Sequence, residues 1–530
     1  MRSTFFIFLA FLIFSTGCRS NSSKAREVTK DTAITPVTAI TRLVLDSNAV
    51  EEFISKTNLD QDQAGYFRNF YISRNYQYAW FTEDGLAEQA KAFWNLRNHY
   101  VEQNRDTTLF DRPLQNRMDT LMAGDTSFNL YTAATRNIEL KLTHQFFTYA
   151  QNAYAGKLDP GELQWHIPRK KIDPVALLDS LVQTRGQDHN WEPVNNLYLR
   201  MRNELEKYNA LVKSGGWAKV SIASGKKIKP GATDSIIPWL KQRLSVYGYI
   251  QSDSSKLYDD SLAIYVGLAQ KSFGFSANKI INAELVNELS VPIERRVEQL
   301  LINMERMRWL PSQAASEFIV VNIPEFRAHI FEEGKEALAM DIVVGKAVHQ
   351  TVIFTGDLKY VVFSPYWNVP SSITRNEIMP AMKKNSNYLA RNNMEITGYN
   401  GSIPVIRQRP GGSNSLGLVK FLFPNSYNIY LHDTPAKSLF GRDRRDFSHG
   451  CIRLSKPFDL AKHLLRKDTS WTDEKIKAAM NKGEEKWVTL SGPVPVFITY
   501  FTSWVSNDGI LNFRKDIYGH DEKLVERMFP

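Results

Sequence analysis

Apolar residues recur at helical spacing through the first part of the chain, from about Val50 to Ala223. In one segment they fall at i, i+4, i+8, i+11 and i+15, which places them on one face of a helix. Gly156 and then Pro160-Gly161 are expected to end this helix, and a second helix is predicted over Asn195–Lys213. The pattern therefore predicts a helical domain over residues 50–223. The first stripe consists of Ile138, Leu142, Phe146, Tyr149 and Ala153.

A basic linker, Ser224–Pro230, separates this region from a smaller helical one. Three short helices are predicted next, with Gly248 and Gly274 between them, and they form a module over residues 231–291. A longer helix, Glu294–Arg308, then forms a connecting segment over residues 292–312. The three short helices are Ile236–Tyr247, Asp260–Phe273 and Ala283–Leu289.

After Pro311 the pattern changes to short β-branched and aromatic runs bounded by turn residues, which predicts a mostly-β domain over residues 314–520. A polar insert at residues 370–403 has a helical pattern and is expected to be a cap over a site, with a decorated loop as the alternative. The last residues, 521–530, are expected to be a tail. The predicted strands are Phe318–Ile323, Phe326–Phe331, Ala337–Val344, Tyr360–Phe363, Leu418–Phe423, Ile429–His432 and Val496–Val505. The fold class is thus multidomain α+β.

The amino terminus has the pattern of a secretory signal. Arg2 precedes the apolar run Phe5–Phe14, which is too short to span a membrane and is followed by small residues and Cys18. The sequence before Cys18 resembles the bacterial lipobox, with Ser15 in place of the usual leucine. We therefore predict a signal peptide over residues 1–17, lipid attachment at Cys18 and a flexible tether over residues 18–49. An ordinary cleaved signal with an incidental cysteine is the alternative.

Composition narrows the classes of function. The chain has 530 residues, a net charge of +10 and two cysteines, which excludes a disulfide scaffold and any multi-cysteine zinc module. The positive charge suits an anionic partner such as nucleic acid, lipid or cell-wall polymer. If Cys18 carries lipid, Cys451 has no disulfide partner. A lone thiol in an oxidising compartment is a liability unless it is used in catalysis, so Cys451 is a candidate catalytic residue.

The segment Phe447–Leu454 is the strongest chemical signal. As a strand it would place His449, Cys451 and Arg453 on one face, where both basic groups would stabilise a thiolate. Gly450 would allow a substrate to approach closely and leave amide groups free for an oxyanion. Upstream, Tyr430 and His432 alternate in the same way, so a second imidazole is expected on a neighbouring strand.

Other interpretations of these residues are a buried structural thiol, or zinc held by His432, His449 and Cys451. We expect no metal, because no fourth ligand is near and no HExxH sequence occurs. A papain-type peptidase is excluded, because in that family the cysteine precedes the histidine.

Tyr430–Pro435 (YLHDTP), a short spacer and Ser448–Arg453 (SHGCIR) together resemble the signature of L,D-transpeptidases with a YkuD-type catalytic domain. Further matching segments indicate the large, YcbB-type periplasmic members. Residues 50–223 would then be the helical scaffold, residues 231–291 a peptidoglycan-binding-like module and residues 370–403 a capping insert. The further matches are Glu305–Pro311, Tyr366–Pro370, Pro410-Gly411, Asn414–Gly417, Lys420-Phe421 and Phe423–Asn425.

The resemblance implies a role for each matched residue. Cys451 would be the acylated nucleophile and His432 the base, held by the backbone carbonyl of Asp433. His449 and Gly450 would shape the oxyanion side, and Arg453 would organise the site. Substrate contacts are assigned to the matched residues Tyr430, Asn414 and Trp367. The module departs from its family at Ser276–Asn282, where both glycines of the usual turn are missing, which puts glycan binding in doubt.

The resemblance further implies cross-linking of peptidoglycan stem peptides through a thioester, with release of D-alanine and a 3-3 cross-link, and no cofactor. Trimming by an L,D-carboxypeptidase or hydrolase, and an inactive wall-binding lipoprotein, are the alternatives. The expected partners are stem peptides and, through the lipid, a membrane; nucleic acid is not expected. We expect a monomer in the periplasm of a Gram-negative-type envelope, anchored to the outer membrane.

Overall fold

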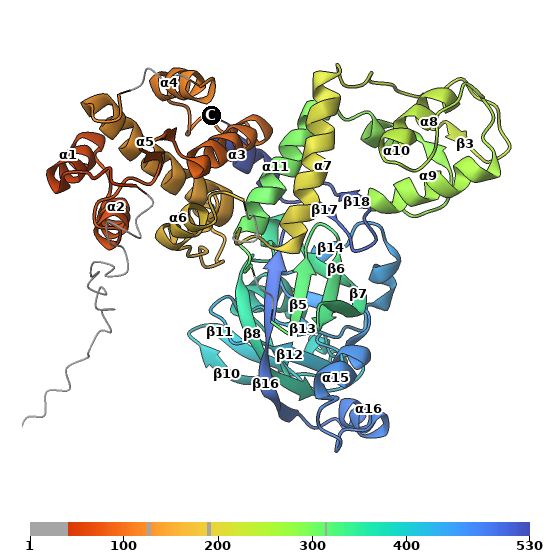
Figure 1. The fold of residues 1–530 in the computed structure, drawn as a ribbon. Helices are drawn as coiled ribbons and strands as arrows, with labels where there is room; N and C mark the ends of the chain where they lie inside the picture. Colours follow the sequence, from red (N-terminus) through yellow and green to blue (C-terminus); the bar gives the residue numbers. More distant parts are fainter. Residues whose placement is uncertain (1–40, 125–128, 188–191, 313–314, 530) are drawn as a thin grey trace, which may run out of the picture. The chain divides into compact units, whose positions relative to one another are not determined.

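The computed structural model describes residues 41–124, 129–187, 192–312 and 315–529 (Figure 1). The predicted signal peptide, Cys18 and most of the predicted tether lie outside these residues. The end of the predicted tether is part of the fold, because Leu43 and Leu45 are buried and helix α1 (Ser47–Thr57) begins before residue 49. Asp46 caps this helix by accepting a hydrogen bond from the Asn48 amide.

The described residues divide into two compact units, one within residues 41–90 and 116–144 and the other within residues 91–115 and 145–529. The first unit contains α1, α2 (Gln61–Ser73) and the short hairpin β1 (Phe81–Thr82) and β2 (Gly85–Leu86). Its interior holds the Glu139 carboxylate, which accepts hydrogen bonds from the amides of Ala79 (2.7 Å) and Trp80 (3.0 Å). Three helices run from one unit into the other: α3 (Glu88–Asn104), α4 (Arg112–Met122) and α5 (Ala133–Ala150).

Two predicted long helices are confirmed in the second unit, α7 (Asn196–Lys213) and α11 (Ile293–Arg308). Asn195 caps α7 through its side chain, and its amide also donates to the Met307 carbonyl of α11 (2.9 Å). Helix α6 (Pro174–Gln183) precedes α7 in this unit. Among the residues that the structure describes, no helix is long and apolar enough to cross a bilayer.

The three short helices of the module are confirmed as α8 (Ile237–Val246), α9 (Asp260–Ser272) and α10 (Ala283–Leu289). The structure adds a two-stranded pairing of β3 (Lys227–Ile228) with β4 (Ile281–Asn282), so part of the predicted linker is a strand. Asn282 ends β4 and caps α10.

The mostly-β domain is built on a nine-stranded sheet in the order β14-β7-β15-β13-β12-β8-β16-β5-β6. Because β6 also pairs with β7, the sheet closes on itself and leaves β14 as an extra edge. The predicted run Val496–Val505 is divided, since β16 ends at Thr499 and β17 (Ser503–Val505) pairs with β18 (Leu511–Phe513) instead. The sheet strands are β5 (Glu317–Asn322), β6 (Arg327–Glu332), β7 (Lys335–Gly345), β8 (Thr355–Phe363), β12 (Val419–Leu422), β13 (Leu431–His432), β14 (Asp446–Ser448), β15 (Ile452–Leu454) and β16 (Lys486–Thr499).

The insert is helical only in its first half, which corrects the prediction. A hairpin of β10 (Met394–Asn400) and β11 (Ile403–Gln408) follows the helices, and β11 pairs with β9 (Trp367–Asn368). Val369, Ile378 and Ile406 form a small core of their own in the insert. Met394, which the predicted helical insert included, lies in β10 and packs against this core together with Ile406 of β11. The helical half consists of α12 (Ser371–Ile373), a π-helical turn (Thr374–Ile378), α13 (Met379–Lys384) and α14 (Tyr388–Arg391).

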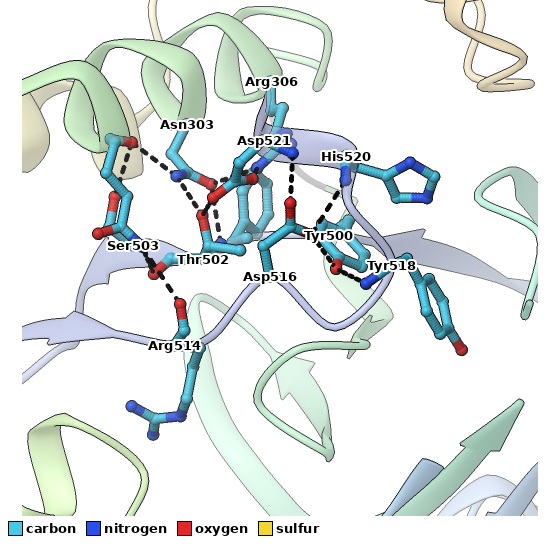
Figure 2. Close-up of polar contacts among 12 residues, drawn as sticks. Asn303, Arg306, Tyr500, Thr502, Ser503, Arg514, Asp516, Tyr518, His520 and Asp521 are labelled. Atoms are coloured by element: carbon cyan, nitrogen blue, oxygen red, sulfur yellow. Dashed lines mark hydrogen bonds and ion pairs between the residues drawn. The ribbon is translucent and has the colours of Figure 1, made fainter. Parts of the chain in front are cut away.

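The predicted C-terminal tail is mostly helix α17 (His520–Met528), and it is bonded into the fold (Figure 2). Asp521 accepts hydrogen bonds from Arg306 of α11 (2.7 Å) and from the Thr502 hydroxyl (2.6 Å). Asn303 of α11 donates to the same hydroxyl (2.8 Å). These bonds connect α11, the segment between β16 and β17, and α17 into one network. The remaining helices are α15 (Pro457–Leu465) and α16 (Asp473–Asn481).

Candidate active site

The predicted nucleophile lies in a turn at the carboxyl end of β7. Strand β14 runs parallel to β7, with Ser448 beside Gly345, whereas β15 runs antiparallel on the other side of β7, with Arg453 beside Val343. Residues 449–451 therefore cross the end of β7. The prediction of one continuous strand with His449, Cys451 and Arg453 on one face is wrong for His449.

Hydrogen bonds and one special residue fix this turn. Gly450 has φ of +117°, a conformation that residues with a Cβ rarely adopt. The Ser448 hydroxyl accepts from the Gly450 amide (3.1 Å) and donates to the Cys451 carbonyl (2.6 Å). The Thr351 hydroxyl donates to the Gly450 carbonyl (2.8 Å). The Gly450 N–H is thus occupied, contrary to the expectation that it would be free for an oxyanion.

Strand β13, which carries the predicted base, neighbours the strand that follows the nucleophile. It pairs in parallel with β15, with His432 opposite Arg453. Because side chains alternate along both strands, Tyr430, His432, Cys451 and Arg453 share one face of this pair. The Cys451 thiol donates to the Asn428 carbonyl (3.5 Å).

His432 is buried and held in one tautomer. Its Nδ1 lies 2.5 Å from the Asp433 carbonyl oxygen, the contact that the resemblance implied. A carbonyl can only accept, so Nδ1 carries the hydrogen and Nε2 has a free lone pair. Burial, followed by the positive charge of Arg453, lowers the pKa of His432 to about 3. The imidazole is therefore neutral at physiological pH, with its lone pair on Nε2.

Asp433 is itself fixed by its carboxylate, which accepts from the amides of Leu418 (2.9 Å) and Thr434 (2.7 Å) and pairs with the Lys437 ammonium. Gly417 packs directly against this carboxylate: its φ is +63°, and a Cβ there would lie 2.4 Å from the carboxyl carbon. These contacts hold the Asp433 backbone, and with it the carbonyl that orients His432.

The Cys451 thiol is protonated at rest. Burial raises its pKa and outweighs the opposing effects of Tyr430 and Arg453. Burial, with Cys451 next, also raises the pKa of Tyr430, whose hydroxyl bonds to the thiol. The expectation of a stabilised thiolate is therefore wrong for the resting site, although Arg453 acts in the expected direction.

His449 points to the insert. Its Nε2 lies 2.8 Å from Oε1 of Glu377 in the π-helical turn, and its ring lies 5.4 Å from that of His349. Neither Glu377 nor His349 belongs to a recognisable sequence motif, so neither was predicted as a site residue. Glu377 lies within the predicted insert, which was the only available signal.

The other predicted site residues have different environments. Asn414 is 1% exposed and donates to the carbonyls of Pro365 (3.1 Å) and Arg409 (2.9 Å), so its amide supports the loop at the base of the insert. This burial argues against direct contact with substrate. Trp367 is half-buried and packs against the core of the insert. Arg453 is half-buried, and its Nε has no hydrogen-bond partner among the described residues.

Within the described ranges, no three His, Cys, Asp or Glu side chains are placed to hold a metal ion. The alternative zinc site would have required His449 to join His432 and Cys451, whereas its Nε2 faces Glu377. The chemistry available here is that of a thiol, a neutral imidazole and a nearby guanidinium.

Comparison with known proteins agrees with this geometry. Residues 316–484 match the family model of the L,D-transpeptidase catalytic domain, YkuD, and residues 65–205 match a scaffold domain model. A Haemophilus influenzae protein, provisionally named an L,D-transpeptidase, is 31% identical over 242 residues. This match covers 43% of the chain and 49% of the relative, so the chain spans about half the length of that protein.

Solved L,D-transpeptidases are also similar in part. One from Stackebrandtia nassauensis is 13% identical, with a TM-score of 0.21, over 53% of this chain and 97% of its own. L,D-transpeptidase 3 from Mycobacterium tuberculosis is 15% identical, with a TM-score of 0.19, over 35% of this chain and 61% of its own. TM-scores this low carry no information on the fold of the whole chain. The match of residues 316–484 and the site within them identify a YkuD-type L,D-transpeptidase catalytic domain in a large multidomain chain.

Proposed function

We propose that the protein is a cysteine-dependent transpeptidase that cross-links peptidoglycan stem peptides through a thioester. The observation that carries the proposal is the neutral His432, held by Asp433 with Nε2 free, on the same face as Cys451. A thiol and an oriented, unprotonated imidazole on one face are the groups that nucleophilic catalysis by cysteine uses.

In the first half-reaction, the thiol proton of Cys451 passes to His432 Nε2 as the sulfur attacks the carbonyl of the third stem residue. His432 then gives this proton to the amine of the departing D-alanine, and the thioester forms. The Gly450 amide is engaged, whereas the Cys451 N–H has no backbone acceptor among the described residues. We therefore assign the oxyanion contact to the Cys451 N–H, with His449 and Gly450 shaping that side.

In the second half-reaction, an amine of a neighbouring stem attacks the thioester and forms a 3-3 cross-link. Water attacking the same thioester would give only trimming, the activity of a carboxypeptidase or hydrolase. An inactive wall-binding protein is disfavoured, because Cys451, His432 and Arg453 share one face and the base is oriented. Tyr430 and Trp367 remain the proposed substrate contacts, and Asn414 is proposed to position the loop.

Outside the catalytic domain, we propose lipid attachment at Cys18 and anchoring to the outer membrane, facing the periplasm. The net charge of +10 suits stem-peptide carboxylates as the anionic partner. We propose that the protein acts as a monomer and does not bind nucleic acid.

Purified protein incubated with disaccharide-tetrapeptide should release D-alanine and form cross-linked dimer, detected by mass spectrometry. A carbapenem, which acylates enzymes of this family, should add one adduct to the wild type and none to Cys451→Ala. Tripeptide as the sole product, even with abundant acceptor, would establish trimming instead. An adduct on Cys451→Ala would place the nucleophile elsewhere.

A further inference from the structure

Glu377 is the carboxylate that the insert contributes beside the nucleophile turn. It pairs with His449, which precedes Cys451 by two residues, and its side chain remains 53% exposed. The next residue, Ile378, is 2% exposed and belongs to the small core of the insert. The backbone at Glu377 is therefore anchored, while its carboxylate faces the turn and remains accessible.

The local backbone is unusual in a way that often marks function. Thr374–Ile378 forms a single π-helical turn, a distortion that is frequent at functional sites. Thr374 in the same turn is 1% exposed, and its hydroxyl has no hydrogen-bond partner among the described residues. A buried hydroxyl without a partner is a cost that a purely structural turn would be expected to avoid.

The acceptor in the proposed reaction imposes a specific chemical demand. An alkyl amine is an ammonium ion at neutral pH and is not nucleophilic until it loses a proton. Of the basic groups here, His449 contacts Glu377, His349 lies against the ring of His449, and Arg375 is on the same turn as Glu377. None of these attracts a cation, whereas the Glu377 carboxylate does.

We propose that Glu377 binds the ammonium group of the acceptor stem and thereby favours cross-linking over hydrolysis. This inference rests on the proposed function and assigns the acceptor subsite of the same site. The ammonium replaces the N–H of the His449 imidazole as the partner of Glu377.

The second half-reaction then balances as follows. One ammonium proton passes to solvent, which leaves a neutral amine. The amine nitrogen attacks the thioester carbon, the carbon–sulfur bond breaks and an amide forms. The second proton leaves the nitrogen through His432 Nε2 and ends on the Cys451 sulfur, which restores the thiol.

The test compares products of wild type and Glu377→Gln at increasing acceptor concentration. The ratio of cross-linked dimer to tripeptide should fall roughly 10- to 100-fold in Glu377→Gln, which is what one hydrogen bond to a charged group is worth. Because both products arise from the same thioester, the ratio is independent of the acylation rate. Glu377→Asp, which keeps the charge, should recover part of the ratio.

Two controls separate acceptor binding from a structural effect. Hydroxylamine is largely uncharged at neutral pH, so its attack on the thioester should be equally efficient in wild type and Glu377→Gln. Glu395→Gln removes a carboxylate of the same insert that pairs instead with Arg407 and Arg409, and its ratio should equal that of wild type.

An unchanged dimer-to-tripeptide ratio in Glu377→Gln would overturn the acceptor role, and so would an equal loss with hydroxylamine. The same loss in Glu395→Gln would attribute the effect to the insert as a whole and also overturn it. If wild type releases D-alanine but forms no dimer at any acceptor concentration, the proposed cross-linking fails. The acceptor role then falls with it.

Discussion

Two single residues, Cys451 and His432, have pKa values that burial shifts in opposite directions. The pKa of Cys451 is raised, and that of His432 is lowered to about 3, so both groups are uncharged at neutral pH. Proton transfer must therefore accompany the attack of the thiol on substrate. A preformed thiolate–imidazolium pair, as in some cysteine proteases, would instead need a high imidazole pKa and a low thiol pKa.

Alkylation of the wild type by iodoacetamide tests this directly. Only the thiolate reacts, and a raised thiol pKa lies above the ordinary value of about 8.5. The rate should therefore rise about tenfold per pH unit from pH 6 to pH 8, because the thiolate fraction rises tenfold per unit at pH values well below the thiol pKa. A rate that is constant across this range would contradict the neutral pair. Free cysteine measured in parallel provides the reference profile.

The two histidines should differ in their effect on acylation. His432→Ala removes the general base and should slow carbapenem acylation by about 10²- to 10⁴-fold. His449→Ala should retain part of the rate, because His449 faces Glu377 and its proposed role is on the oxyanion and acceptor side. Intact-mass measurements over time give both rates. If the order is reversed, His449 is the base and the assignment is inverted.

At the scale of elements, the nucleophile turn depends on hydrogen bonds from distant segments. Thr351 accepts from the Gly345 amide (2.9 Å) at the end of β7 and donates to the Gly450 carbonyl (2.8 Å). Tyr518 precedes α17 in the chain, and its hydroxyl donates to the Gly345 carbonyl (2.6 Å). Tyr518 is also connected to the network of α11 and α17. Its amide donates to the Tyr500 hydroxyl, which donates to Asp516, and Asp516 accepts from the Asp521 amide (Figure 2).

Thr351→Val keeps the shape of the side chain but removes the hydroxyl, and with it the hydrogen bonds to the Gly345 amide and the Gly450 carbonyl. We expect acylation of Cys451 to slow about tenfold, which corresponds to roughly 1.4 kcal/mol and is the scale of one hydrogen bond. Carbapenem acylation followed by mass spectrometry measures the rate, and thermal unfolding reports stability separately. Thr397→Val is the matched control, because its hydroxyl bonds within the exposed β10–β11 hairpin. Equal rates in wild type and Thr351→Val would show that the turn does not need this hydroxyl.

At the scale of the whole molecule, the amino-terminal segment is predicted to anchor the protein to a membrane. The Phe5–Phe14 run and Cys18 predict a lipid anchor ahead of the fold. Cys18→Ala should move the protein from the detergent phase to the aqueous phase of a phase-separation assay, with unchanged activity of the purified protein. Recovery of the mature wild type from the aqueous phase would contradict the anchor, and Cys451→Ala should partition like wild type.

The sequence alone determined the features that depend on neighbouring residues. Helices such as α7 and α10 could be predicted because the spacing of their apolar residues, and the residues that begin and end them, all lie within the segment itself. Cys451 and His432 were found because short motifs surround them, and the β13–β15 pairing confirmed that their strands are neighbours. The YkuD-type domain was recognised from the same segments, and the family model match confirms it.

Only the tertiary structure decided features that arise from contacts between distant segments. The turn at His449–Cys451 requires β7 to lie between β14 and β15, an order that alternation along one strand cannot reveal. Strand β10, which falls within the predicted helical insert, forms by pairing with β11, and β11 in turn pairs with β9 earlier in the chain. The neutral resting state of Cys451 and His432, and the pairing of Glu377 with His449, follow from burial and packing. Burial is a property of the assembled fold, and no local sequence pattern encodes it.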